Sequence, residues 1–198
     1  MPPRVTATQT IHDGWGNLKR HTLDDGHTRE IYDHGHAVGC LALDPARGTV
    51  LLVRQHRLPI ALHDHDLAGF GGSDGASLEV PAGLIEEGEA PADTMAREME
   101  EETGYRVNDL AFLADLYASP GSLSERMILY TAMYRSGARI GEGDRVAEGG
   151  GLESEGERLE VVEMTLADAL DLLRSGGIRD LKTAFLLAHA AKGLAGRD

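Results

Sequence analysis

The sequence has one cysteine in 198 residues, so it cannot form a disulfide framework within the chain. A reducing cytoplasm is therefore the expected compartment. Cys40 lies in the apolar run AVGCLAL, and we expect it in the core and not as a nucleophile. No apolar run reaches the roughly 18 residues that a membrane span needs. The start, MPPRVTATQT, lacks the apolar stretch of a signal peptide, so neither a membrane nor a secretory route is expected.

Basic residues are also scarce. The chain has 19 lysines and arginines against 33 aspartates and glutamates, which gives a formal net charge of −14. This charge repels phosphate backbones, so nucleic acid is not expected as a partner. Small phosphorylated substrates are still compatible with it, because a divalent cation can invert the local field.

The hydrophobic pattern predicts one domain, possibly with a small appendage, and no internal repeat. Residues 1–10 are expected to be a loose tail, and the Gly- and Asp-rich residues 61–77 a loop. Apolar and β-branched runs predict three strands within residues 28–59 and further strands near residues 78–81, 110–119, 125–134 and 159–164. The expected architecture is a mixed, mostly β core with helices on its faces, an α/β layered fold.

Three helices are expected, over residues 91–104, 165–177 and 180–193. Thr165 is the predicted N-cap of the second, with Asp168 three residues on. The first helix is expected to pack on the sheet through an apolar stripe of Ala92, Met95, Ala96 and Met99. The third is expected to do so through Leu181, Ala184, Phe185 and Ala188.

The first helix carries an unusual concentration of acid. Glu98, Glu101 and Glu102 stand at i, i+3 and i+4, which predicts that their carboxylates gather on one face, while Glu100 points to solvent. Carboxylates about 6 Å apart repel by about 3 kcal/mol at an effective dielectric near 20. A hard divalent cation such as Mg²⁺ would reverse that sign, since it prefers oxygen ligands. A solvated acidic face is the alternative.

The wider stretch GLIEEGEAPADTMAREMEEETGY, residues 83–105, decides between these readings. It matches the Nudix box, GX5EX7REUXEEXGU, in which X is any residue and U an apolar one, at every fixed position. The chain therefore resembles the Nudix hydrolases. The resemblance implies an α/β/α sandwich around a mixed β-sheet. It also implies a loop–helix–loop that binds Mg²⁺, or Mn²⁺, to hydrolyse nucleoside diphosphates linked to another group.

By this resemblance the metal ligands are Glu98, Glu101 and Glu102, with the carbonyl of Ala82 as a further one. Glu102 is also counted among the catalytic residues. Two supporting roles are implied as well: Gly83 and Gly104 serve tight turns, and Glu89 pairs with Arg97 to hold the loop against the helix.

Flanking segments resemble one branch of the family, the ADP-ribose pyrophosphatases and GDP-mannose hydrolases. These segments are EVPAG before the box, SPG followed by Ser124 and Glu125 after it, and GIRDLKT before the last helix. TREIYDHG and IRDLKT favour the GDP-mannose type. The implied reaction is pyrophosphate hydrolysis of a nucleoside diphosphate sugar to a nucleoside monophosphate and a sugar phosphate. ADP-ribose hydrolysis is one alternative, and a non-catalytic nucleotide-sugar sensor is another.

The acidic loop GGGLESEGERLEV is expected to supply a general base and a further ligand. The resemblance places Glu155 as base, with Glu153 as its rival, and Glu157 as metal ligand. The alternative is that at least one of the three only solvates the loop.

Several further residues are candidates for substrate contact. Arg57 and Arg54 suit bidentate phosphate binding, against the alternative of surface ion pairs. Arg29 and Glu30 resemble residues that reach a nucleotide base across a homodimer interface. Residues 1–33 are therefore interpreted as a tail and strands that form a possible dimerisation arm, and residues 34–198 as the hydrolase domain. Lys182 either neutralises phosphate or orders the last helix. Trp15 either stacks on a base or packs the arm.

Overall fold

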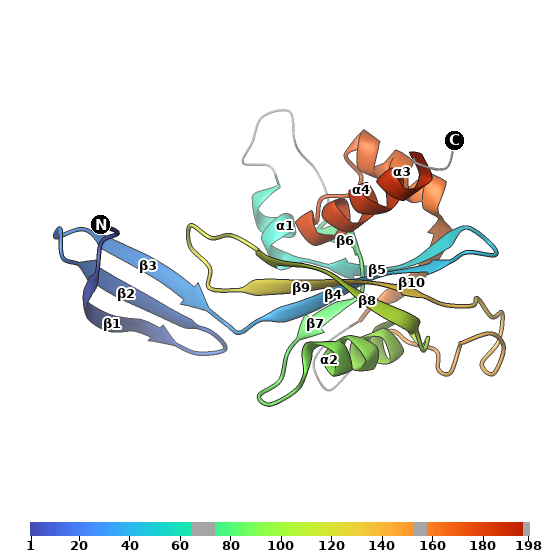
Figure 1. The fold of residues 1–198 in the computed structure, drawn as a ribbon, viewed down its shortest axis with the longest axis horizontal. Helices are drawn as coiled ribbons and strands as arrows, with labels where there is room; N and C mark the ends of the chain where they lie inside the picture. The colour runs from blue at the N-terminus through green and yellow to red at the C-terminus, as the bar shows by residue number, and fades with distance from the viewer. Residues whose placement is uncertain (65–73, 153–157, 196–198) are drawn as a thin grey trace.

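A computed structural model describes residues 1–64, 74–152 and 158–195. A large twisted β-sheet forms the middle layer, with α3 and α4 on one face and α2 on the other (Figure 1). The predicted α/β layered fold is therefore confirmed. Among the described residues, no helix has the length and apolar character that crossing a membrane would require.

The large sheet has seven strands and is mixed, as predicted. Its main path runs β10-β5-β4-β9-β8, and only the β4–β9 pair is parallel. The strands on this path are β4 (Ala37–Asp44), β5 (Thr49–His56), β8 (Asn108–Tyr117), β9 (Arg126–Met133) and β10 (Glu160–Thr165).

The two central strands β4 and β5 separate along their length. They pair where Ala42 lies opposite Leu51, but beyond that point β5 pairs with β6 (Ala76–Glu79) and β4 pairs with β7 (Ala82–Leu84). The segment from β6 to β7 therefore fills the gap between diverging strands, and it brings the backbone of Ala82 and Gly83 to the middle of the sheet.

Residues of β4 and β5 alternate between two hydrophobic clusters, one on each face. Leu41, Val50 and Leu52 pack under α3 and α4, whereas Val38, Cys40 and Leu51 pack against α2. A strand buried on both faces reads as a continuous apolar run, which is why AVGCLAL contains no polar residue. Cys40 is fully buried, and burial raises the pKa of its thiol to about 12, so its predicted place in the core is confirmed.

Helix α2 (Pro91–Glu98) continues directly into a π-helical turn, η1 (Met99–Thr103), and ends at Gly104. Met95 and Met99 are fully buried as predicted, and each contributes about 1.5–3 kcal/mol by burial. Ala92 and Ala96 are exposed, so that half of the predicted stripe was wrong. The buried face also holds Thr94, Glu98, Glu102 and Thr103. Their polar groups have partners, since the two threonine hydroxyls donate to the carbonyls of Ala90 and Met99, and Glu102 accepts from the Ala82 N–H of β7.

Helix α3 (Leu166–Ser175) has the predicted N-cap: the Thr165 hydroxyl accepts a hydrogen bond from the Asp168 N–H. Helix α4 (Leu181–Ala195) packs on a different face from the one predicted. Leu181 and Phe185 are exposed, and the buried side is formed by Thr183, Leu186 and Leu187. The pattern was ambiguous because every residue from 184 to 188 is apolar.

The N-terminal residues form a separate three-stranded antiparallel sheet that projects from the body (Figure 1). It comprises β1 (Val5–Asp13), β2 (Asn17–Leu23) and β3 (Thr28–Asp33). The expected loose tail over residues 1–10 was therefore wrong, because β-branched residues there pair with β2. The expected loop over residues 61–77 was also partly wrong, since α1 (Leu58–His63) enters it and β6 begins at Ala76.

Candidate functional site

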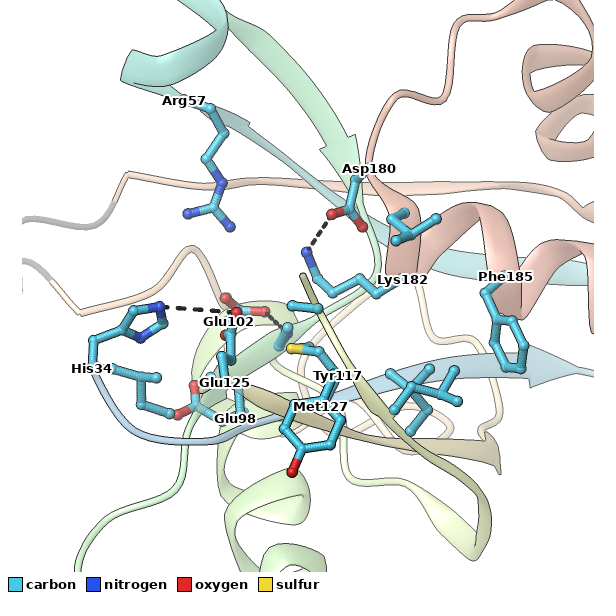
Figure 2. Close-up of a pocket in the computed structure, with 18 of the residues that line it drawn as sticks. His34, Arg57, Glu98, Glu102, Tyr117, Glu125, Met127, Asp180, Lys182 and Phe185 are labelled. Carbon is cyan, nitrogen blue, oxygen red and sulfur yellow. Dashed lines mark hydrogen bonds and ion pairs between the residues drawn. The ribbon is translucent and has the colours of Figure 1, made fainter. Parts of the chain in front are cut away.

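A cavity of about 880 Å³ opens where β4 and β5 separate. This volume lies within the usual range for small-molecule sites. Its walls come from β5, β7, β8, β9, the end of α2 with η1, the start of α4 and the end of the N-terminal sheet that carries Trp15 and His34. Figure 2 shows Arg57 and Lys182 facing it from one side and Glu98 and Glu102 from the other. Opposite charges therefore face one another across the cavity.

Two of the three predicted metal-ligating carboxylates lie together at this cavity. Glu98 and Glu102 line it and are 8% and 2% exposed. Glu101 is not part of the lining, and its carboxylate accepts a 2.8 Å hydrogen bond from Arg97. The Glu101 carboxylate nevertheless lies close to that of Glu98, because the same Arg97 nitrogen, Nη1, is 2.9 Å from Glu98 and 2.8 Å from Glu101. Metal binding by all three glutamates stays a prediction.

Arg97 ties the acidic helix to the loop before it. Its Nε and Nη2 each donate at 3.2 Å to Glu89, and its Nη1 lies 2.9 Å from the Glu98 carboxylate. The predicted Glu89–Arg97 pair is therefore confirmed. Hydrogen bonding to Glu89 and the nearby carboxylates raise the pKa of Arg97, and the same hydrogen bond lowers the pKa of Glu89. A fixed cation thus offsets repulsion among the glutamates.

The two glycines of the box have different roles. Gly104 has φ +76° and ends the helix in the left-handed region, as expected for a turn. Gly83 has no positive φ and lies in β7 opposite Val38. A Cβ there would overlap the carboxyl group of Glu98. The predicted turn role of Gly83 was therefore wrong, since its missing side chain leaves room for the Glu98 carboxylate.

A buried carboxylate, Glu79, joins the two cationic side chains of the cavity. Arg57 donates to it through Nε and Nη2 at 2.9 and 2.8 Å, and Lys182 Nζ donates at 2.6 Å. Lys182 also lies 3.0 Å from Asp180. Burial disfavours the charge on Glu79, but the hydrogen bonds and charges of Arg57 and Lys182 outweigh it and lower its pKa to about 2. Glu79 is therefore ionised throughout the working range of pH.

The lowered pKa of Glu79 predicts that acid reduces the stability of the fold. A carboxyl group with a pKa of about 2 when folded, against an ordinary 4.5, stabilises the fold above pH 4.5 and loses that contribution as pH falls towards 2. The difference corresponds to about 3 kcal/mol at most. Urea unfolding across pH 2–6 should therefore show a shallower fall in the free energy of unfolding for Glu79→Gln than for the wild type. Equal slopes would contradict the prediction.

The other predicted substrate residues lie outside the cavity lining. Arg54 is on β5 and pairs with Glu160 at 2.8 Å. Arg29 and Glu30 are on β3, where Glu30 pairs with Arg20 at 2.6 Å. Contact of these residues with a substrate stays a prediction. Three predicted loop residues, Glu153, Glu155 and Glu157, fall in the segment 153–157, outside the described residues.

The sequence named Trp15 as a candidate but did not connect it with His34 and Glu125, which lie beside it at the cavity. Trp15 stacks on His34 with ring centroids 5.1 Å apart, and His34 Nε2 lies 3.9 Å from a Glu125 oxygen. All three residues line the cavity, and His34 and Glu125 are labelled in Figure 2. His34 and Glu125 are separated by 91 positions and no periodicity connects them. The quoted segments TREIYDHG and SPG followed by Ser124 and Glu125 were the only signals near them.

The chemistry of the acidic side fits a hard divalent cation. The carboxylates of Glu98 and Glu102 and the backbone of Ala82 supply oxygen donors at one place, and buried carboxylates favour a nearby cation. Among residues 1–64, 74–152 and 158–195, no three acidic, histidine or cysteine side chains converge as a ready-made metal cage. A complete ligand set therefore needs backbone oxygen, movement of Glu101, or the segment 153–157.

Comparisons with known proteins agree with this geometry. The model of the NUDIX domain matches residues 33–181. A GDP-mannose pyrophosphatase of Cronobacter sakazakii is 38% identical over 163 residues, covering 82% of this chain and 77% of that protein. A GDP-mannose pyrophosphatase of Pectobacterium atrosepticum is 34% identical over 197 residues, covering 96% and 94%. The crystal structure of an ADP compounds hydrolase has a TM-score of 0.73 at 22% identity, covering 100% and 96%, which shows the shared fold.

Proposed function

This chain belongs to the NUDIX family, and on that premise we propose that it hydrolyses the pyrophosphate bond of a nucleoside diphosphate sugar, with GDP-mannose as the favoured substrate. The products would be a nucleoside monophosphate and a sugar phosphate. The supporting observation is the agreement of relatives named GDP-mannose pyrophosphatase over 82–96% of the chain with an intact acidic helix at a cavity.

The arrangement of charge suits a diphosphate. Arg57 and Lys182 face the cavity from one side and provide donors for phosphate oxygens. Glu98 and Glu102 face it from the other side, where their own charge would repel a diphosphate unless a cation lay between. The cavity thus combines direct cationic contacts with a place for a bridging ion.

We assign the ion, Mg²⁺ or Mn²⁺, to Glu98, Glu102, Glu101 and the carbonyl of Ala82, with Glu157 as a further ligand. When bound there, a divalent cation supplies positive charge to the diphosphate and makes a nearby water more acidic. Arg97 holds the acidic helix in place through Glu89. Glu155, or its neighbour Glu153, is the proposed base that takes the proton from the attacking water.

We also propose that residues 1–33 are a dimerisation arm, with residues 34–198 as the hydrolase domain. Support comes from the family match, which begins at residue 33, and from β1, which is exposed along its whole length. In a homodimer Arg29 and Glu30 would contact the nucleotide base held by the other copy. Light scattering tests the assembly, and a mass of one chain would contradict it.

Purified protein should release GMP from GDP-mannose in the presence of Mg²⁺ and lose this activity when EDTA is added. ADP-ribose and diadenosine polyphosphates serve as competing substrates under the same conditions, with monophosphate products separated by ion-exchange chromatography. A higher kcat/KM for ADP-ribose would transfer the assignment to that substrate. Tight binding of GDP-mannose with no monophosphate from any substrate would favour a sensor instead of a hydrolase.

A further inference from the structure

We propose that Glu79 is a positioning residue, which sets the orientation of Arg57 and Lys182 so that both present donors to the diphosphate. This inference rests on the proposed function, because it assigns a role within the same cavity. Glu79 itself is not part of the cavity lining and is 2% exposed. It therefore acts through the two side chains that it holds.

The contact with Arg57 fixes the plane of the guanidinium group. Glu79 accepts one hydrogen bond on each carboxylate oxygen, from Nε at 2.9 Å and from Nη2 at 2.8 Å. This paired geometry restricts rotation about the last bonds of the arginine. In the part of the chain that the structure describes, no acceptor bonds to Nη1, the remaining nitrogen. Glu79 thus engages one edge of the group and leaves another edge for a phosphate oxygen.

Glu79 also holds Lys182, which comes from the first turn of α4. The ammonium group donates to Glu79 at 2.6 Å and lies 3.0 Å from Asp180. Asp180 is itself fixed at the start of α4, since its other oxygen accepts hydrogen bonds from the Thr183 N–H and hydroxyl at 2.9 and 2.6 Å. An ammonium group has three protons, and these contacts occupy two. The third is available to a ligand in the cavity.

The charge balance explains why a carboxylate is needed at this place. Arg57, Lys182, Glu79 and Asp180 together carry no net charge, so two cations can stay close together in the free protein. Without Glu79 the two cations would repel each other and turn towards solvent. Glu79 comes from β6, which pairs with β5, and it lies opposite Val53, four positions before Arg57. The pairing of these strands therefore brings the carboxylate within reach of the arginine side chain.

The test is a kinetic comparison of Glu79→Gln with the wild type on GDP-mannose. An amide cannot accept from three cationic donors as a carboxylate does. We expect KM to rise about 10–100-fold while kcat stays within about 3-fold, since the lost contacts concern binding. Glu163→Gln is the matched control, because Glu163 accepts hydrogen bonds from Thr49, Tyr134 and Ser136 and lies outside the cavity lining. Its KM should equal that of the wild type.

A double-mutant cycle with Arg57 distinguishes a positioning role of Glu79 from a general loss of structure. In an Arg57→Ala background, Glu79→Gln should have a smaller effect on KM than in the wild type, because one of the groups it positions is absent. Full additivity of the two changes would overturn the proposal, as would an unchanged KM in Glu79→Gln. Melting temperatures of all variants identify any that fail to fold.

A binding measurement keeps this test independent of the reaction. Trp15 is the only tryptophan and lines the cavity, so its fluorescence can report GDP-mannose binding in EDTA. If the wild type releases no GMP, the proposed function fails, but the ratio of the two Kd values still decides the role of Glu79. Weaker binding to Glu79→Gln supports the role, and equal Kd values overturn it.

Discussion

Turnover of GDP-mannose should fall by about 100-fold or more when Glu102 is replaced by glutamine. Glu102 is 2% exposed, lines the cavity and accepts a 2.9 Å hydrogen bond from the Ala82 N–H. Glutamine keeps the shape and one acceptor oxygen but removes the negative charge that would hold a divalent cation. The melting temperature should stay within about 4 °C of the wild type, because the backbone hydrogen bond can be retained.

The control for this variant is Glu100→Gln on the same π-helical turn. Glu100 pairs with Arg106 on the surface, so its loss should leave turnover and melting temperature near wild-type values. Steady-state assays at several Mg²⁺ concentrations measure both variants. Wild-type turnover in Glu102→Gln would contradict the assignment of this carboxylate, whatever the behaviour of Glu100→Gln.

Gly83→Ala should reduce turnover by about 10–100-fold although it adds only a methyl group. The new Cβ would occupy the space of the Glu98 carboxyl group, which would have to leave its place at the cavity. The overlap is with the far end of a flexible side chain and not with backbone, so the cost in stability should be small. A loss of activity at nearly constant melting temperature is the expected combination.

Gly48→Ala is the control for Gly83→Ala, because it should lower stability without lowering activity. Gly48 has φ +67° in the turn between β4 and β5, with open space where a Cβ would lie. Alanine there costs about 1 kcal/mol of backbone strain without approaching the cavity. It should therefore lower the melting temperature and leave turnover unchanged. If both glycine variants lost activity in proportion to stability, the steric explanation for Gly83 would fail.

Local sequence patterns predicted much of the fold and the acidic helix. Thr165 and Asp168 identify a helix start because the capping contact spans three residues. The resemblance to the Nudix hydrolases implied the Glu89–Arg97 pair, whose partners stand only eight positions apart in the chain. Interactions of this kind are encoded within one turn or one loop, where a single sequence contains all the information.

The features that were missed depend on distant partners or on subtle helix geometry. Glu79 meets Arg57 and Lys182 across 22 and 103 positions, so only the sheet register reveals the cluster. The π-helical turn at Met99–Thr103 contains no unusual residue, so the sequence pattern predicted an ordinary α-helix there. The buried face of α4 was misplaced because its apolar residues surround the helix, which leaves periodicity without a preferred direction.

The burial of Cys40 has a practical consequence for measuring how copies of this chain assemble. Its thiol is inaccessible within the sheet and stays protonated at neutral pH, so thiol-reactive probes should leave the native protein unlabelled. A cysteine introduced at an exposed position of β1 would then carry the label alone. Distances between spin labels attached there would report the separation of two arms directly, with no second substitution needed to silence a competing thiol.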